Sequence, residues 1–293
     1  MNKQLAISST LLLLLLLLCF LGPYMPFLQS PEDVKEYILH ENGMIEVAPF
    51  SPSKVYWFGT DHYGVDLVTL IITGGRDTLL VVFAITVLRY VIAVPLGIMA
   101  RKNKGFFHGI VQSLNSFFSM VPILFFALLF MNLPMFLLSE HRLLLILLTL
   151  ALLECGRTAT AVQTQVGQID RSTYIEGAII NGSKWSTVFR FYYWRHLRTQ
   201  LVILFFLDAS RVMLLLGQLG FLSMFFAQTW VYDESIGILV RNDLHIWPTM
   251  LADTRKFLQS NIWIPLAPAF MITITIFTLQ LFGEGLRSYF EKK

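Results

Sequence analysis

Long apolar stretches, separated by polar and charged segments, constrain this chain more than any other feature of its sequence. A helix needs about 20 apolar residues to cross the hydrocarbon core of a bilayer. Stretches of about that length cover residues 5–21, 78–100, 110–138, 143–161, 201–226 and 264–282. The backbone of a spanning segment must satisfy its own hydrogen bonds, which favours helices. The sequence therefore predicts an all-α polytopic membrane protein with about six transmembrane helices.

Composition agrees with this prediction and excludes other classes. Of the 293 residues, 55% are hydrophobic and only 14% are charged, whereas about a quarter of the residues are charged in soluble domains. The net charge of +3 is too small to indicate binding to nucleic acid. The two cysteines, Cys19 and Cys155, lie in apolar stretches, so we expect no disulfide.

The first apolar stretch contains eight consecutive leucines, Leu11 to Leu18. It is longer than the apolar core of a usual signal peptide and continues into Gly22-Pro23 without a small-x-small cleavage site. We therefore expect residues 1–22 to be an uncleaved membrane anchor. The proline-rich and polar residues 23–77 follow, and they should lie outside the cytoplasm.

The distribution of Lys and Arg predicts the orientation of the chain. With six spans and both termini in the cytoplasm, 13 of the 22 basic residues lie inside, 7 lie outside and 2 lie within spans. Excess positive charge on the cytoplasmic side is the usual arrangement. Residues 78–287 then form the transmembrane domain, with a cytoplasmic loop at about 164–199 and a cytoplasmic tail at 288–293.

The stretch from Thr173 to Trp185 predicts a helix, a turn and a second helix on the cytoplasmic face. Thr173 and Glu176 have the spacing of a capping box, which begins a helix. Asn181-Gly182 favours a helix end, because these residues adopt positive φ at least cost. Ser183 can cap the next helix. Such a protrusion suits docking of another protein, although an ordinary interfacial helix has the same local pattern.

The fourth span becomes polar from Glu154, so we expect it to leave the bilayer near Arg157. Three charged residues then lie inside predicted spans, where charge is costly and usually faces a bundle interior or a polar path. Arg89 lies near the middle of the second span and has no obvious local partner. Asp208 and Arg211 are three residues apart in the fifth span, so they share one helix face and can pair. They could line a translocation path, or they could form an internal ion pair that fixes helix packing.

Enzyme motifs are missing from the sequence. It contains no Gly-Lys dipeptide and hence no P-loop, and it contains no His-Glu-x-x-His, Cys-x-x-Cys or Gly-x-Ser-x-Gly. The six histidines lack the spacing of metal ligands. We expect no catalytic residue, metal or cofactor in this chain. A lipid-modifying membrane enzyme is disfavoured because no acid–base pair lies near the interface.

Several motifs resemble those of permeases of ABC importers. Glu176-Gly177-Ala178, three further residues and Gly182 are similar to the "EAA loop", which docks on a cytoplasmic ATPase, and Tyr174 also matches. Gly177 replaces the usual Ala, and the Leu-Pro that usually closes this loop is missing. The implied ATPase-coupling residues are Tyr174, Glu176, Gly177, Ala178 and Gly182.

Three other segments resemble the C-type subunit of dipeptide and oligopeptide permeases. Residues 58–66 with 74–79 are similar to the "FGTDxxGRD … GxRxSL" signature, with Val65 in place of Arg and Thr78 in place of Ser. Residues 247–258 and 283–287 are similar to the "WGxMLxxGRxyL" and "GDGLRD" segments. Gly217-Gln218 stand where the family typically has Glu-Ala. The chain is thus identified as a divergent member of this family.

The resemblance implies a multi-pass subunit of the cell (inner) membrane that works by alternating access. Its implied partners are a second homologous permease subunit, two cytoplasmic ABC ATPase subunits, an extracytoplasmic solute-binding protein and membrane lipid. Peptides are the implied substrate, with nickel complexes or sugars as other family solutes. A membrane scaffold or sensor that uses the permease fold without transport is the alternative function.

Overall fold

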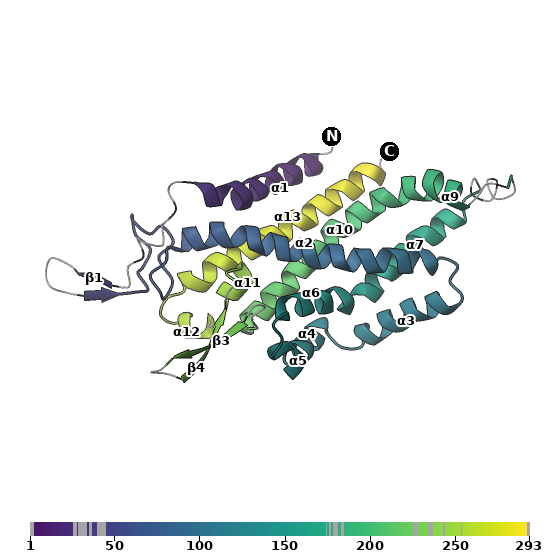
Figure 1. The fold of residues 1–293 in the computed structure, drawn as a ribbon. Coiled ribbons are helices and arrows are strands. Elements are labelled where there is room, and N and C mark those ends of the chain that lie inside the picture. Colours follow the sequence, from purple (N-terminus) through teal and green to yellow (C-terminus); the bar gives the residue numbers. More distant parts are fainter. Residues whose placement is uncertain are drawn as a thin grey trace. The chain divides into compact units, whose positions relative to one another are not determined.

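The computed structural model describes residues 3–25, 28, 34, 37–39, 45–173, 175, 177, 181–182, 185–224, 228–233, 237–242, 244–252 and 254–291. Most of these residues are helical (Figure 1). Four helical stretches are long and apolar enough to cross a membrane, and two bent helix pairs bring the number to six if each pair is one span. The prediction of a helical polytopic membrane protein is confirmed.

The four unbroken stretches correspond to the first, second, fifth and sixth predicted spans. They are α1 (Lys3–Leu21) with the 3₁₀ turn η1 (Gly22–Tyr24), α2 (Leu67–Met99), the π-helical turn η3 (Phe189–Tyr193) with α10 (Trp194–Phe221), and α13 (Trp263–Glu291).

The third and fourth predicted spans are the bent pairs. Helices α3 (Phe106–Ser119) and α4 (Ile123–Met131) meet at 89°, and α5 (Pro134–Leu137) follows. Proline has no N–H and disfavours helical backbone in the residue before it, which explains the bend at Pro122. Helices α6 (Arg142–Leu153) and α7 (Cys155–Asp170) meet at 44° on either side of Glu154.

The start of α2 differs from the prediction. The helix begins at Leu67 rather than at Thr78, because Asp66 caps it: the backbone N–H and the hydroxyl of Thr69 both donate to Asp66 Oδ2 at 3.1 Å. Residues 67–77, expected in the polar segment, are therefore about three helical turns.

Two regions expected as loops contain short antiparallel hairpins. Strand β1 (Tyr37–Leu39) pairs with β2 (Ile45–Val47), and β3 (Gln228–Asp233) pairs with β4 (Gly237–Asn242). In the second hairpin the backbone of Trp230 is paired with that of Val240. Further short helices, among the fully described segments, are α9 (Trp185–Val188), α11 (Trp247–Met250) and α12 (Thr254–Phe257).

The chain divides into two compact units. Unit 1 consists of Met1–Ala6, Phe83–Val212 and Leu279–Lys293, and unit 2 of Ile7–Val82 and Met213–Thr278. In unit 1, α3 packs along α7, and Gly156 permits this contact because an added Cβ would lie 2.5 Å from the backbone nitrogen of Asn115. In unit 2, Trp247 is the largest fully buried side chain.

Candidate functional site

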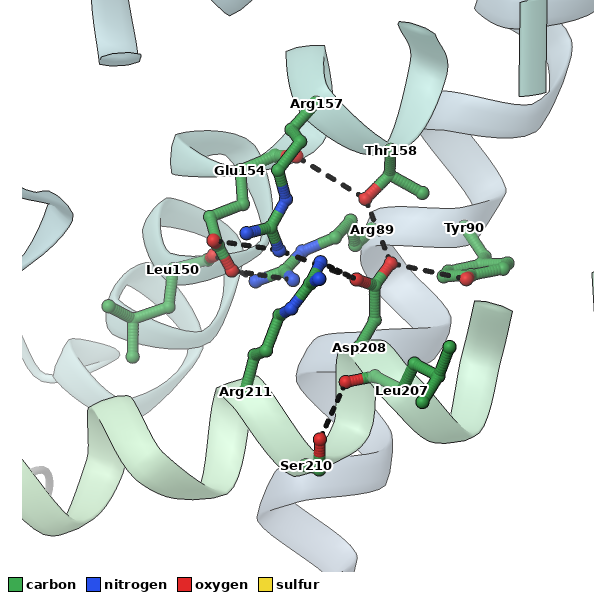
Figure 2. Close-up of polar contacts among 10 residues, drawn as sticks. All are labelled: Arg89, Tyr90, Leu150, Glu154, Arg157, Thr158, Leu207, Asp208, Ser210 and Arg211. Atoms are coloured by element: carbon green, nitrogen blue, oxygen red, sulfur yellow. Dashed lines mark hydrogen bonds and ion pairs between the residues drawn. The ribbon is translucent and has the colours of Figure 1, made fainter. Parts of the chain in front are cut away.

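Unit 1 contains a cluster of five charged side chains, Arg89, Glu154, Arg157, Asp208 and Arg211, which we call the charge cluster (Figure 2). Arg89 comes from α2, Glu154 and Arg157 from the bend between α6 and α7, and Asp208 and Arg211 from α10. All three charged residues singled out in the sequence therefore belong to one site.

Arg89 is completely buried, and its partner lies 65 residues further along the chain. Its Nη1 donates to Glu154 Oε2 at 2.9 Å, and its Nη2 donates to the carbonyl oxygen of Leu150 at 3.1 Å. The bend explains the second bond. The N–H of Glu154 turns to the carbonyl of Leu152, so the carbonyl of Leu150 lacks its i+4 partner, and Arg89 takes that place.

Asp208 accepts hydrogen bonds from four side chains. The hydroxyls of Tyr90 and Thr158 donate to Oδ2 at 3.1 and 3.0 Å. Arg157 and Arg211 both reach Oδ1 at 3.4 Å. Asp208 and Arg211 form the ion pair that their spacing allows, but it is a long contact of 3.4 Å between a buried acid and an arginine side chain that is 52% exposed.

Arg157 joins the two acids of the charge cluster. It also contacts Glu154 Oε1 at 2.8 Å, and its side chain is 41% exposed. Three guanidinium groups thus face two carboxylates, which leaves one positive charge in excess. Such an arrangement can fix the helices and can still bind an anion.

Sequence reasoning missed four members of this site: Tyr90, Glu154, Arg157 and Thr158. The i,i+3 spacing of Glu154 and Arg157 was the available signal. The prediction treated Glu154 and Arg157 as the polar end of the fourth span rather than as partners of Arg89; the helix α7 itself continues to Asp170.

The central stretch around Gly182 is described in part. Thr173, Ile175 and Gly177 are helical, and the N–H of Asn181 donates to the carbonyl of Gly177 at 3.1 Å. Gly182 has φ 73°, as predicted for a helix stop. Thr173 is the first helical residue of this stretch, so the helix begins where it was predicted to begin. Tyr174, Glu176, Ala178 and Ser183 lie outside the described residues.

A buried apolar cluster anchors this stretch in unit 1. Ile175 is fully buried in it, and the other buried members are Val162, Val166, Val188, Tyr193 and Leu197. The hydroxyl of Tyr193 donates to Asp170, which also pairs with Arg101 at 3.5 Å. Among the described residues, an added Cβ at Gly177 or Gly182 would meet nothing within 4 Å. The stretch is thus packed into unit 1 through Ile175, and no described residue packs against the two glycines.

In unit 2, two motifs that carry the resemblance meet at Trp247, and we call this contact the Trp247 node. The N–H of Trp247 donates to Thr78 Oγ1 at 2.9 Å, and its Nε1 donates to the carbonyl of Ile71 at 2.7 Å. Thr78 donates in turn to the carbonyl of Gly74. A Cβ at Gly75 would lie 2.7 Å from the indole ring. Gly75 therefore makes room for the indole, and Gly74 makes room for the carbonyl oxygen of His245, which would lie 2.7 Å from an added Cβ.

The turn before α2 is also held by its motif residues. Asp61 Oδ1 accepts the N–H groups of Tyr63 and Val65 at 3.0 and 2.8 Å. Burial raises the pKa of the Asp61 carboxyl, and these two bonds lower it less. Val65, which replaces Arg in the resemblance, contributes its backbone to this turn.

Comparison with known proteins gives one family. Residues 93–293 match the model of the binding-protein-dependent transport system inner membrane component. The chain is 24% identical to the dipeptide transport system permease protein DppC of Alkalihalophilus pseudofirmus, over 83% of this chain and 73% of that protein. It is 24% identical to the oligopeptide transport system permease protein OppC and 23% identical to the probable D,D-dipeptide transport system permease protein DdpC, both of Escherichia coli. These matches cover the whole chain and 88% and 89% of the two relatives.

Proposed function

Because the chain belongs to the family of binding-protein-dependent transport system inner membrane components, we propose that it is the permease subunit of an ATP-driven importer of peptides. The family match over residues 93–293 carries the proposal. The names of the relatives, which are dipeptide and oligopeptide permeases, support peptides as the substrate class.

The proposed complex contains this chain, a second homologous permease, two cytoplasmic ABC ATPases and an extracytoplasmic solute-binding protein. Both termini of this chain would lie in the cytoplasm, in accord with the distribution of its basic residues. The ATPases hydrolyse ATP, and the two permeases form an alternating-access path for the solute. The charge cluster would line that path.

Coupling to the ATPases would occur at Tyr174, Glu176, Gly177, Ala178 and Gly182. The buried position of Ile175 supports this role, because a segment that transmits a push must be fixed to the helices it moves. The surroundings of Gly177 and Gly182 support it as well: among the described residues, an added Cβ at either position would meet nothing within 4 Å, so another protein could approach the backbone closely there.

Gly182→Asp tests this role. The strained left-handed conformation costs about 1 kcal/mol for a residue other than glycine, so the chain should still insert and fold. The carboxylate would stand at the docking surface, and we expect ATP-dependent uptake to fall about tenfold or more while expression is unchanged. Gly177→Ala is the matched control, because it restores the usual family residue in open space.

A pull-down of the tagged chain from its native membrane in mild detergent tests the complex itself. The wild type should recover an ATPase and a second permease. Glu176→Ala and Gly182→Asp should lose the ATPase and keep the second permease. If the wild type recovers no ATPase, the importer proposal is wrong, and the scaffold or sensor becomes the function to examine.

A further inference from the structure

The three arginines of the charge cluster differ in their burial and in the length of their contacts. Arg89 is buried, with contacts of 2.9 and 3.1 Å to Glu154 and Leu150. Arg211 is more than half exposed, and its ion pair with Asp208 is 3.4 Å long. Arg157 lies between these extremes. Arg89 is therefore committed to the fold, whereas Arg211 is not.

Asp208 does not depend on Arg211. Among the described residues, Tyr90, Thr158 and Arg157 also donate to its carboxylate. Loss of the Arg211 contact would leave Asp208 with three donors. Arg211 can thus exchange its partner at little cost to the buried acid.

Arg157 and Arg211 place two guanidinium groups on the same atom, Asp208 Oδ1 (Figure 2). Like charges so close repel each other, most strongly where water is scarce. The cluster as a whole has one positive charge in excess. An added anion beside Arg211 would relieve both the repulsion and the excess charge.

We propose that Arg211, with Arg157 beside it, binds a carboxylate of the transported solute, such as the C-terminal carboxylate of a peptide. This inference rests on the proposed importer function. A guanidinium group matches the two oxygens of a carboxylate, and such charge-assisted pairs are strong when partly desolvated. Arg211 would release Asp208 when the carboxylate arrives and return to it when the solute leaves. The positive charge would then favour peptides with a free C-terminus.

The test is ATP-dependent uptake of tri-alanine and of tri-alanine amide by the complete complex in proteoliposomes. The ratio of the two uptakes isolates the permease, because the binding protein stays the same in all variants. Arg211→Gln should lower tri-alanine uptake about tenfold to a hundredfold and leave the uptake of the amide unchanged. Arg211→Lys should retain part of the preference for tri-alanine over its amide, since lysine keeps the positive charge but lacks the paired N–H donors of a guanidinium group. Lys104→Gln, which removes one exposed positive charge in the turn after α2, should have no effect.

Other outcomes would overturn the inference. An equal loss of both uptakes, together with weaker recovery of the second permease, would mean that Arg211 pairs with an acid of that subunit. No change in either uptake would mean that Arg211 does not meet the solute. If the wild-type complex takes up neither peptide, the peptide-importer function fails instead. Binding of tri-alanine to the purified complex without ATP then tests Arg211 alone, and equal affinity of wild type and Arg211→Gln would refute its role.

Discussion

The charge cluster of unit 1 and the Trp247 node of unit 2 use polar groups in opposite ways. The node is neutral and buried, and the hydrogen bonds of Thr78 and Trp247 are 2.6–2.9 Å long. The charge cluster has long contacts of 3.4 Å, exposed guanidinium groups and an excess charge. The node thus has the properties of a site that stabilises the fold, whereas the charge cluster can bind a further anionic group.

The comparison also separates family resemblance from candidate chemistry. Contacts at the Trp247 node are made between motif residues, namely Gly74, Gly75, Thr78 and Trp247. The charged residues of the cluster lie outside the motifs that carry the resemblance. A motif can therefore identify the fold of a permease without indicating which residues meet its solute.

Trp247→Ala should give the largest effect. It removes a fully buried indole ring, together with the contacts that the surrounding residues make with that ring. Large-to-small changes of this kind cost about 3–5 kcal/mol. We expect a lower unfolding temperature of the purified chain in detergent, measured by scanning fluorimetry, and reduced yield. An unchanged unfolding temperature would show that the node does not stabilise unit 2.

Arg89→Met should come next. Breaking a buried ion pair from one side costs about 3–5 kcal/mol, but Glu154 keeps Arg157 at 2.8 Å, so we expect a value at or below the lower end. The second change Glu154→Leu should recover part of the lost stability, because it removes the acid that has lost one of its two arginine partners. A double variant less stable than Arg89→Met would contradict this account. The same pair of measurements distinguishes the buried arginine from Arg211, whose loss should alter stability by less than about 1 kcal/mol.

Thr78→Val sharpens the comparison, because it removes the hydroxyl from a node that is otherwise unchanged in shape. The N–H of Trp247 loses its acceptor, which costs about 1–3 kcal/mol for a buried group. Thr78→Ser is the control, since serine can donate to Gly74 and accept from Trp247 in the same way. Thermal unfolding should rank the wild type and Thr78→Ser close together and Thr78→Val below both; equal values for all three would refute the role of the hydroxyl.

The sequence predicts where the long helices lie, but it does not predict which side chains on different helices contact one another. Apolar length predicts α1, α2, α10 and α13, and Pro122 predicts the bend after α3, because these are local properties of the chain. Glycine is unfavourable inside a helix by local propensity, yet Gly74 and Gly75 lie inside α2, and the space that their missing Cβ atoms leave is used by His245 and Trp247, which are distant in the sequence.

The charge cluster shows the same limit. The pairing of Asp208 with Arg211 is local and was predicted from their spacing. The partner of Arg89 depends on the packing of α2 against the bend at Glu154, a contact between residues 65 positions apart. No periodicity within either segment contains that information, so a sequence can supply the charged residues of such a site without their arrangement.

Asp61→Asn should give the smallest effect and bears on charge in unit 2. Burial raises the pKa of Asp61 above its usual 3.8 in the folded chain. The folded state therefore binds the proton more tightly than the unfolded state, so Asp61 favours folding below pH 3.8. This contribution is lost as the pH rises through the folded pKa.

Asparagine keeps an oxygen that can accept the N–H groups of Tyr63 and Val65 and has no charge. Across the mildly acidic range above pH 3.8, the wild type should lose stability with rising pH, by less than about 1 kcal/mol from this residue, and Asp61→Asn should lose correspondingly less. Thermal unfolding of both proteins at several pH values measures the difference between the slopes. Parallel pH profiles would show that the carboxylate is well solvated in this turn. A shallower slope for the variant would show that the charged carboxylate of Asp61 lowers the stability of unit 2. The charges of unit 1, by contrast, are paired.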